Sequence, residues 1–549
     1  MFLNLRSLAI FVAVGAEFAA AAWTNVTAES AWAAMNPGWN LGNTLDAIPD
    51  ETSWGNPLVT ATLLDSIKAA GINSIRLPVT WTDHFSSQAP DYLVTTAWMD
   101  RVEQITNWSL ERGFWVVLNV HHDSWQWADM SSDTDLDLKI AKFEALWKQI
   151  AARFKDKSEK LILESLNEPP GSTQAHAERY NDLNQRFVNI VRASGGNNGK
   201  RLLTLPGLAT NIQKTVDWFT VPTNAAPYIL HVHDYDPWDF VSTSWGRTFW
   251  GTAADKQAIE DTFIALQNRF HAPALIGEWG LTGKSVENAA GWVYFDFFVR
   301  TSRAYNLTAQ LWDNGLDHFD RTTLTWRDPV KADIIQKAVK GISNSLPAYD
   351  QTAALYFKSG ATLAATNINL VFNGNTISSV VNASGMTMKK GTDYTVTTAG
   401  ITISKAYLTT ALSGSTLGVR DTLTIKFSAG ISLPFELRLY TTPTLGQTSY
   451  TLSSTTDLSI PFDGKGSTLA TVKALRADGT YLKEDWTQYL GDLQKARINW
   501  GDFDVSGTNI VLYAALLSTI QATGQAVTLT FEFWPRTVAN NVTAIISFA

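Results

Sequence analysis

Short apolar runs alternate with longer amphipathic stretches from about residue 30 to residue 345. The runs that we expect to be strands are Gly38–Leu41, Ser74–Leu77, Trp115–Val120, Leu161–Leu166, Leu202–Leu205, Tyr228–Val232, Ala274–Ile276 and Ala309–Leu311. Between them lie helical patterns such as Thr134–Phe154, whose apolar face consists of Ile140, Phe143, Leu146, Trp147 and Ile150. Eight strand–helix units over roughly 300 residues predict an α/β fold, the (β/α)8 TIM barrel. A doubly wound open sheet is the alternative, but no glycine-rich phosphate fingerprint follows an early strand.

The pattern changes after residue 347, where Thr, Ser and Gly become frequent. Stretches such as "LAATNINLVFNG", "YTVTTAGITIS" and "TLTIKFSAG" alternate with a period of two, and their frequent turns predict a β-sandwich. Thr441–Gln447 resembles a linker, and a second β-rich segment follows it. We therefore predict a barrel in residues 23–347 and two all-β domains in residues 348–442 and 443–549.

The N-terminal segment contains one Arg, a short apolar run and a stretch of small residues that ends near Ala22. This pattern predicts a secretory signal peptide at residues 1–22. The apolar run is too short for a stable membrane-spanning helix. We expect the mature chain to begin near Trp23, outside the cell, and to be a monomer.

Composition narrows the classes of partner. The net charge of −8 is spread along the chain, which argues against a nucleic acid or an anionic membrane. The sequence has no cysteine, which excludes disulfides and thiolate metal sites. Its 22 Trp, 26 Phe and 15 Tyr indicate either large aromatic cores or a surface that stacks on sugar rings, and composition alone favours the cores.

Polar and aromatic residues follow the C-terminal ends of most predicted strands. In a (β/α)8 barrel these ends meet at one mouth, which carries the active site. The residues concerned are Arg76, His121, His122, Asn167, Glu168, His233, Tyr235, Glu278 and Trp312. Two glutamates at one mouth, without cysteine or a phosphate loop, suggest hydrolysis of a glycosidic bond. One carboxyl must donate a proton to the leaving oxygen, and the other must be ionised to attack the anomeric carbon or to activate water.

The neighbours of the two glutamates fit this chemistry. Arg76 near Glu278 would keep that carboxylate ionised, and Tyr235 could do likewise. His233 could help to manage the proton of Glu168. In the same scheme Asn167 would reach the 2-hydroxyl of the sugar.

A metal centre is the competing chemistry. It would use His121, His122, His233 and a glutamate as ligands. The sequence has no HExxH pair, and we expect neither a metal nor another cofactor.

Several motifs resemble glycoside hydrolase family 5, and specifically its fourth subfamily. They are "GWNLGNTLDA", "WGNP", "IRLPVTW", "NVHHD", "LNEP", "HVHDYDPWDF" and "GEWG", in the family's order over about residues 25 to 345. The resemblance implies a (β/α)8 barrel and a retaining mechanism in which Glu168 is the acid/base and Glu278 the nucleophile. The other positions that it implies in the active site or in substrate binding are Arg76, His121, His122, Asn167, His233, Tyr235, Trp312, Asn43, Trp54 and Trp238. Many relatives have Tyr where Asp234 stands, which puts one subsite contact in doubt but not the catalysis.

The C-terminal half resembles two accessory modules. "KKGTDYTVTTAGITISKAYL" is similar to the immunoglobulin-like X2 module, and "EDWTQYLGDLQKARINWGDFD" to a family 46 carbohydrate-binding module. Trp486, Tyr489 and Trp500 are candidates for sugar contact, and Phe503 has the same polar flanks. The alternative is that these aromatic residues fill the core of their domain.

The resemblance implies a secreted endo-β-1,4-glucanase whose substrate is a β-glucan polysaccharide: cellulose-like glucan, mixed-linkage glucan or xyloglucan. A mannanase or xylanase with the same two glutamates is the first alternative, because subsite loops set the sugar. A catalytically inactive carbohydrate-binding protein is the second, and the intact pair Glu168 and Glu278 speaks against it.

Overall fold

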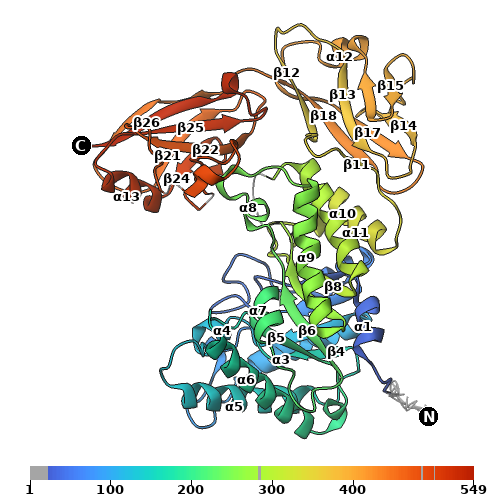
Figure 1. Cartoon of the computed structure of the whole chain (residues 1–549), viewed down its shortest axis with the longest axis vertical. Coiled ribbons are helices and arrows are strands. Elements are labelled where there is room, and N and C mark those ends of the chain that lie inside the picture. The colour runs from blue at the N-terminus through green and yellow to red at the C-terminus, as the bar shows by residue number, and fades with distance from the viewer. Residues whose placement is uncertain (1–22, 282–285, 484–485, 500) are drawn as a thin grey trace, which may run out of the picture.

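A computed structural model describes residues 23–281, 286–483, 486–499 and 501–549 (Figure 1). The predicted signal peptide, residues 1–22, and the sugar-contact candidate Trp500 lie outside these residues. Within the described part of the chain, no helix is both long and apolar enough to cross a bilayer.

The first domain is a closed barrel of eight parallel strands in chain order, as predicted. Its strands are β1 (Gly38–Asn40), β2 (Ser74–Leu77), β3 (Trp115–Asn119), β4 (Leu161–Glu164), β5 (Leu203–Asn211), β6 (Tyr228–His233), β7 (Ala274–Trp279) and β8 (Leu307–Leu311). Barrel strands are covered on both faces, which explains their continuous apolar runs. The largest differences from the predicted bounds are in β5 and β7, which are six and three residues longer at their C-terminal ends.

Helices surround the barrel. They are α1 (Ala28–Met35), α2 (Ala61–Ala69), α3 (Thr96–Glu111), α4 (Asp123–Gln126), α5 (Leu136–Phe154), α6 (Gln174–Ala193), α7 (Ile212–Trp218), α8 (Trp238–Val241), α9 (Ala253–Phe270), α10 (Asn288–Ala304) and α11 (Pro329–Val339). The predicted apolar face of α5 is buried except at Ile140, which is partly buried. A short hairpin, β9 (Phe319–Asp320) and β10 (Thr325–Trp326), follows β8.

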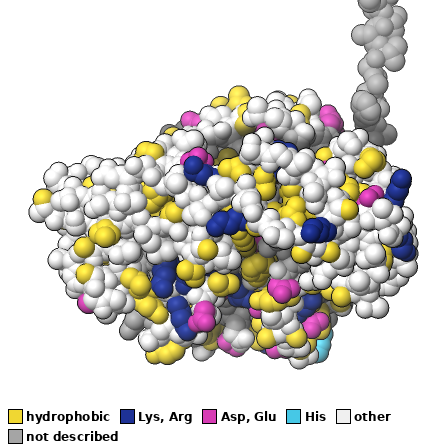
Figure 2. Space-filling model, turned by 90° about the horizontal axis from the view of Figure 1, so that it is seen from above, with side chains coloured by type: hydrophobic (Ala, Val, Ile, Leu, Met, Phe, Trp, Pro, Cys, Tyr) yellow, Lys and Arg dark blue, Asp and Glu magenta, His cyan; other side chains and the backbone are white. Residues whose placement is uncertain are grey.

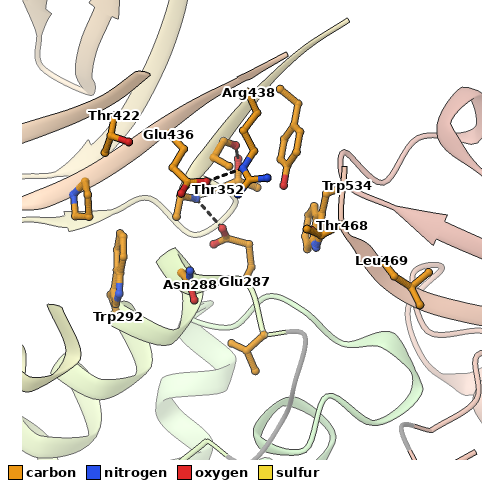
Figure 3. Close-up of a pocket in the computed structure, with 15 residues that line it drawn as sticks. Glu287, Asn288, Trp292, Thr352, Thr422, Glu436, Arg438, Thr468, Leu469 and Trp534 are labelled. Atoms are coloured by element: carbon orange, nitrogen blue, oxygen red, sulfur yellow. Dashed lines mark hydrogen bonds and ion pairs between the residues drawn. The ribbon is translucent and has the colours of Figure 1, made fainter. Parts of the chain in front are cut away.

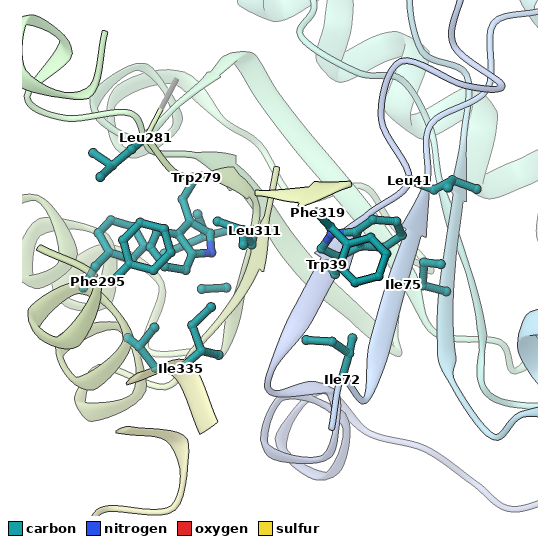
Figure 4. Packing of buried hydrophobic residues seen from close by; sticks show 14 of the residues in the cluster. Trp39, Leu41, Ile72, Ile75, Trp279, Leu281, Phe295, Leu311, Phe319 and Ile335 are labelled. Carbon is teal, nitrogen blue, oxygen red and sulfur yellow. The ribbon is translucent and has the colours of Figure 1, made fainter. Parts of the chain in front are cut away.

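Aromatic residues fill much of the space between barrel and helices (Figure 4). Trp279, at the end of β7, stacks on Phe298 of α10 with ring centroids 4.5 Å apart. Trp39 of β1 meets Phe319 edge to face at 6.4 Å. Both tryptophans are almost fully buried, so a large share of the aromatic composition serves the core.

Two β-sandwiches follow the barrel and lie on one side of it (Figure 1). The second domain pairs the sheets β11-β13-β16-β15 and β12-β18-β17-β14, and the third pairs β19-β21-β24-β23 and β20-β26-β25-β22. The elements of the second domain are β11 (Leu346–Pro347), β12 (Ala354–Lys358), β13 (Thr366–Val371), β14 (Ile377–Val381), β15 (Tyr394–Thr397), β16 (Gly400–Ile403), α12 (Lys405–Ala411), β17 (Gly418–Phe427) and β18 (Leu433–Tyr440). Those of the third are β19 (Thr444–Leu445), β20 (Ser449–Leu452), β21 (Leu458–Asp463), β22 (Leu469–Arg476), β23 (Phe503–Ser506), β24 (Asn509–Leu512), α13 (Ala514–Ala522), β25 (Val527–Phe533) and β26 (Val542–Phe548).

The segments that connect the domains contain short strands that the sequence pattern does not predict. Strand β19 lies inside the predicted linker and pairs with β21. Strand β11 lies just before residue 348 and pairs with β13 of the second domain. Such two-residue strands have no period that a sequence pattern can reveal, since their partners lie far along the chain.

The three domains meet around a pocket of about 400 Å³ (Figure 3). Glu287, the N-cap residue of α10, is buried there and accepts hydrogen bonds from the backbone N–H groups of Ala289 and Ala290 and, at 2.6 Å, from that of Ala353 in the second domain. Burial raises the pKa of the Glu287 carboxyl to about 7, although these N–H groups and Lys331 act in the opposite direction. The barrel is thus joined to the second domain through a buried carboxyl group.

The third domain contacts the barrel through the segment that follows β6. Arg536 donates to the carbonyl oxygen of Gly246 at 2.8 Å, and the amide of Gln494 to Asp239 at 2.9 Å. Trp245 packs edge to face against Trp486 at 4.4 Å. Seen from above, basic and acidic side chains are interspersed over the face in view (Figure 2).

Candidate active site

Arg76, at the end of β2, is fully buried and links two carboxylates. Its Nη1 donates to Glu278 Oε1 at 2.7 Å, while Nε and Nη2 donate to the two oxygens of Glu164 at 2.8 Å. Its Nη2 also donates to Asn167 Oδ1 at 2.7 Å. The expected contact of Arg76 with Glu278 is present as a charge-assisted hydrogen bond.

Glu278 lies at the C-terminal end of β7 and is nearly buried. A register shift between β6 and β7 leaves one extra residue, Gly277, directly before it. Such bulges re-aim the following side chain, and here Glu278 meets the hydroxyl of Tyr235, which donates to its Oε2 at 3.1 Å. His121 Nε2 lies 4.0 Å from the other oxygen.

Asn119, in β3, fixes the tautomer of His121. Its Oδ1 accepts from the backbone N–H of Val79 at 3.0 Å, so its Nδ2 is the group that lies 2.9 Å from His121 Nδ1. His121 Nδ1 therefore accepts, and the N–H on Nε2 points toward Glu278. Burial, with nearby positive groups, holds the pKa of His121 well below its usual range, so this imidazole is neutral.

Glu168 faces Glu278 from the loop after β4, and its side chain is 49% exposed. Its Oε1 lies 2.8 Å from His233 Nδ1. One oxygen of each carboxylate and a nitrogen of His233 all lie within 4.8 Å of one another. Burial raises the pKa of Glu168, but the hydrogen bond and charge of His233, together with Arg76 and His122, outweigh burial and lower the pKa below its ordinary value.

Aromatic side chains surround this pair. The Trp312 ring lies parallel to that of His121, with centroids 5.9 Å apart. Trp54 and Trp238, both predicted to support substrate binding, are 39% and 55% exposed. The Trp54 ring lies 5.3 Å from that of His122. The Trp238 ring meets that of Tyr235 edge to face at 6.4 Å, so both exposed indoles adjoin residues of the barrel mouth.

Trp125 was missed by the sequence reasoning. It is 51% exposed, and its indole N–H donates to His122 Nδ1 at 3.0 Å. The signal was available, because Trp125 follows the "NVHHD" motif by two residues. Trp54 and Trp125 flank His122 on the same side of the mouth.

Glu164 and His231 were also missed, and both are fully buried beneath the mouth. Glu164 is a carboxylate inside an otherwise apolar strand, and His231 precedes His233 by two residues in β6. Alternation along a strand places residues i and i+2 on the same side, which is the signal that could have located His231.

Asn43 and Asp234 are structural neighbours of the mouth. Asn43 has a left-handed backbone (φ 52°), and its N–H donates to Asp46 Oδ2 at 3.0 Å. Asp234, at the position where the family pattern often has Tyr, is buried and accepts from the N–H of Asp236 at 2.9 Å. Burial and the charge of Asp236 raise the pKa of Asp234 to about 8.

Two groups in the described part of the chain have metal-ligand spacing. They are Asp46 with His121 and His122, and Glu168 with His233 and Glu278. In the second group the carboxylate oxygens already have partners, namely Arg76, Tyr235 and His233. Hydrogen bonding of this kind is what a general acid and a nucleophile require.

The aromatic residues of the third domain divide into buried and exposed ones. Phe503 is in the core, whereas Tyr489 is 83% exposed. Trp486 is partly buried against Trp245 of the barrel. Of the sugar-contact candidates that the structure describes, Tyr489 is thus the most accessible.

The family pattern "Cellulase (glycosyl hydrolase family 5)" matches residues 40–317. The chain belongs to glycosyl hydrolase family 5. It is therefore a glycoside hydrolase, and the predicted family is confirmed. Further patterns match residues 349–437 (carbohydrate binding domain X2) and 442–545 (CBM46, a carbohydrate binding domain), which confirms both predicted module types.

Relatives of this family-5 chain include proteins that match it over nearly its whole length. It is 35% identical to endoglucanase B of Paenibacillus lautus, over 97% of this chain and 94% of that protein. A crystal structure of a tri-modular subfamily-4 endo-β-1,4-glucanase from Bacillus licheniformis, complexed with cellotetraose, has 37% identity and a TM-score of 0.87 over 95% of this chain and 100% of that one. A xyloglucan-specific endo-β-1,4-glucanase of Bacteroides ovatus is 33% identical over 57% of this chain and 69% of that protein.

Proposed function

We propose that this hydrolase is a secreted endo-β-1,4-glucanase that cleaves internal bonds of β-glucan with retention of configuration. The observation that carries the proposal is the pair Glu168 and Glu278, with one oxygen of each within 4.8 Å of the other. Retaining glycosidases hold their carboxyl groups about 5–5.5 Å apart, whereas inverting enzymes need a wider gap for a water. The short separation supports a covalent glycosyl-enzyme.

The two carboxyl groups divide the reaction. Glu278, whose oxygens accept from Arg76 and Tyr235, attacks the anomeric carbon as a carboxylate. Glu168 transfers its proton to the glycosidic oxygen as the bond between that oxygen and the anomeric carbon breaks. In the second step Glu168 takes a proton from water, and the water oxygen replaces Glu278 on the anomeric carbon.

Glu168 needs a proton for the first step, although its pKa lies below the ordinary value in the free enzyme. The pair with His233 supplies one, because a proton bound between the two groups can move from Nδ1 to Oε1. A bound glucan strips water from the half-exposed carboxyl group, which disfavours its charged form. Once Glu278 is esterified its negative charge is gone, and Glu168 then gives up the proton more readily and acts as a base.

The glucan class follows from the relatives and from the mouth. The cellotetraose complex and the xyloglucan-specific relative indicate β-1,4-linked glucose backbones, and the exposed Trp54, Trp125 and Trp238 offer stacking faces on the barrel. In the third domain the exposed Tyr489 is a candidate for a further sugar contact, with Trp486 and Trp500 as the other candidates. A mannanase or xylanase remains the alternative, because it would use the same two carboxylates.

The test compares Glu278→Gln with the surface control Glu111→Gln on a panel of mixed-linkage glucan, xyloglucan, mannan and xylan. Glu278→Gln should lose at least about 10⁴-fold in kcat, since the amide cannot form the ester, while Glu111→Gln should retain full activity. Proton NMR of early products should show the β-anomer. An initial α-anomer would refute retention, and turnover confined to mannan or xylan would refute the glucan assignment.

A further inference from the structure

We propose that His231 and Glu164 are positioning residues that fix the tautomer of His233 and thereby set the proton that His233 shares with Glu168. The inference rests on the proposed acid/base role of Glu168. It comes from a chain of contacts below the mouth. His233 Nδ1 lies 2.8 Å from Glu168 Oε1, its Nε2 lies 3.1 Å from His231 Nε2, and His231 Nδ1 lies 3.4 Å from Glu164 Oε2.

Glu164 is the fixed end of this chain. Burial alone would raise the pKa of its carboxyl group, but Arg76, His231 and Asn119 lower it to about 2. Arg76 donates to both of its oxygens, and Asn119 donates to Oε1 at 2.9 Å. An ionised carboxylate can only accept hydrogen bonds. His231 Nδ1 is the ring nitrogen that lies near it, and this atom has no hydrogen-bond partner among the described residues. The negative charge 3.4 Å away therefore favours the proton on Nδ1.

His231 is neutral, because burial holds its pKa well below the usual range. A neutral imidazole has one N–H and one lone pair. With the proton on Nδ1, its Nε2 must accept, and the N–H that it accepts is that of His233 Nε2. Neutral His233 therefore turns a lone pair, not an N–H, toward Glu168.

This assignment constrains the Glu168–His233 pair. A hydrogen bond between Oε1 and Nδ1 forms when one proton is present, either on oxygen or on nitrogen. When that proton leaves, a carboxylate faces a lone pair, which is unfavourable. The pair therefore keeps its proton to a higher pH than it would if His233 could turn an N–H toward the carboxylate. That proton is the one that the leaving oxygen needs.

Other ionisable groups face the pair from every neighbouring strand. Glu278 Oε2 lies 3.7 Å from His233 Nδ1. The remaining groups with an electrostatic influence on Glu168, His233 or His231 are Arg76, His121, His122 and Tyr235. His231→Phe leaves all of these groups and the Arg76–Glu164 ion pair in place, so its titration reports on the relay from Glu164 through His231 to His233. Glu164→Gln also removes the charge partner of Arg76, so its titration is compared with that of His231→Phe.

Two variants interrupt the relay at different points. His231→Phe keeps a ring but removes the acceptor, and Glu164→Gln removes the charge that orients His231. His318→Phe is the matched control, because His318 is another buried histidine of the barrel, packed against Phe295 rather than the pair. Activity is measured as kcat/KM against pH on cellotetraose, which needs leaving-group protonation, and on 2,4-dinitrophenyl β-cellobioside, which does not.

On cellotetraose, kcat/KM falls at high pH as the pair loses its proton. In both relay variants this fall should begin about one pH unit lower, which is a tenfold loss of kcat/KM at a given alkaline pH. On the dinitrophenyl substrate kcat/KM of His231→Phe should stay within about twofold, and His318→Phe should leave both profiles in place. Equal losses on both substrates with an unmoved limb would overturn the relay, because that is what a purely structural defect produces.

Nitrogen-15 NMR of histidine-labelled wild-type protein provides a readout that does not depend on turnover. At pH 9 His233 should have its proton on Nε2, and in His231→Phe the proton should be on Nδ1. A wild-type His233 with its proton on Nδ1 would refute the proposal. Failure of the acid/base assignment itself looks different: Glu168→Ala would then lose equally on both substrates, whichever tautomer His233 has.

Discussion

Gly277, the bulge residue before Glu278, has no room for a side chain. A Cβ added there would lie 1.9 Å from His231 Nε2 and less than 3 Å from two ring carbons. Unstrained carbon contacts begin near about 3.5 Å, so in Gly277→Ala the His231 ring must retreat by about 1.5 Å. The ring cannot do so freely, because it is fully buried between Glu164 and His233.

The expected size of the effect follows from this displacement. Overpacking a well-packed core costs about 1–3 kcal/mol, so the free energy of unfolding of Gly277→Ala should fall by that amount. A misplacement of about 1 Å in a catalytic group can cost about 10²-fold, and His231 contacts the partner of Glu168. We therefore expect kcat/KM on cellotetraose to fall about 100-fold.

The assay combines urea unfolding with kinetics on three variants. Gly199→Ala is the control, since a Cβ there meets nothing within 4 Å, and it should change stability by less than about 0.5 kcal/mol. Adding His231→Ala to Gly277→Ala restores the space, so the double variant should be more stable than the sum of the single effects. Its activity should stay low, because His233 has lost its partner. Wild-type stability and activity in Gly277→Ala would show that β7 yields and that the packing argument is wrong.

Two further predictions concern the joints between domains. Arg536→Ala removes hydrogen bonds to Gly246 and Thr248 of the barrel. Turnover of long xyloglucan or mixed-linkage glucan should therefore fall several-fold, while kcat/KM on an aryl cellobioside changes less than about twofold. Equal losses on both substrates would mean that the contact only stabilises the barrel. The pKa of Glu287 rises from 4.5 to about 7 on folding, so its ionisation costs the folded state up to about 3 kcal/mol as pH rises through that window. The free energy of unfolding should therefore fall between pH 5 and pH 8, and Glu287→Gln should flatten this part of the slope; an unchanged slope in the variant would contradict the assignment.

Sequence patterns located the barrel strands well because each strand is a short apolar run between amphipathic helices. Glu278 and Glu168 could be predicted to lie close together because strand ends converge in this fold, and the structure brings them within 4.8 Å. Glu164 and His231 escaped notice, since their importance lies in contacts between β2, β4 and β6 that no local pattern records. The same reason explains β19, whose partner β21 turns a predicted linker into part of a sheet.

The interface between the barrel and the third domain is formed by two parts of the chain that are far apart in sequence. Residues 238–250 supply Asp239, Trp245 and Gly246, and Gln494, Trp486 and Arg536 complete it from more than 200 residues away. A substitution in either part therefore removes contacts of the other. A chimera that transfers residues 443–549 alone to another barrel would carry only one side of this interface. A chimera that also transfers the segment after β6 would carry both sides. That segment follows the strand end that presents Tyr235.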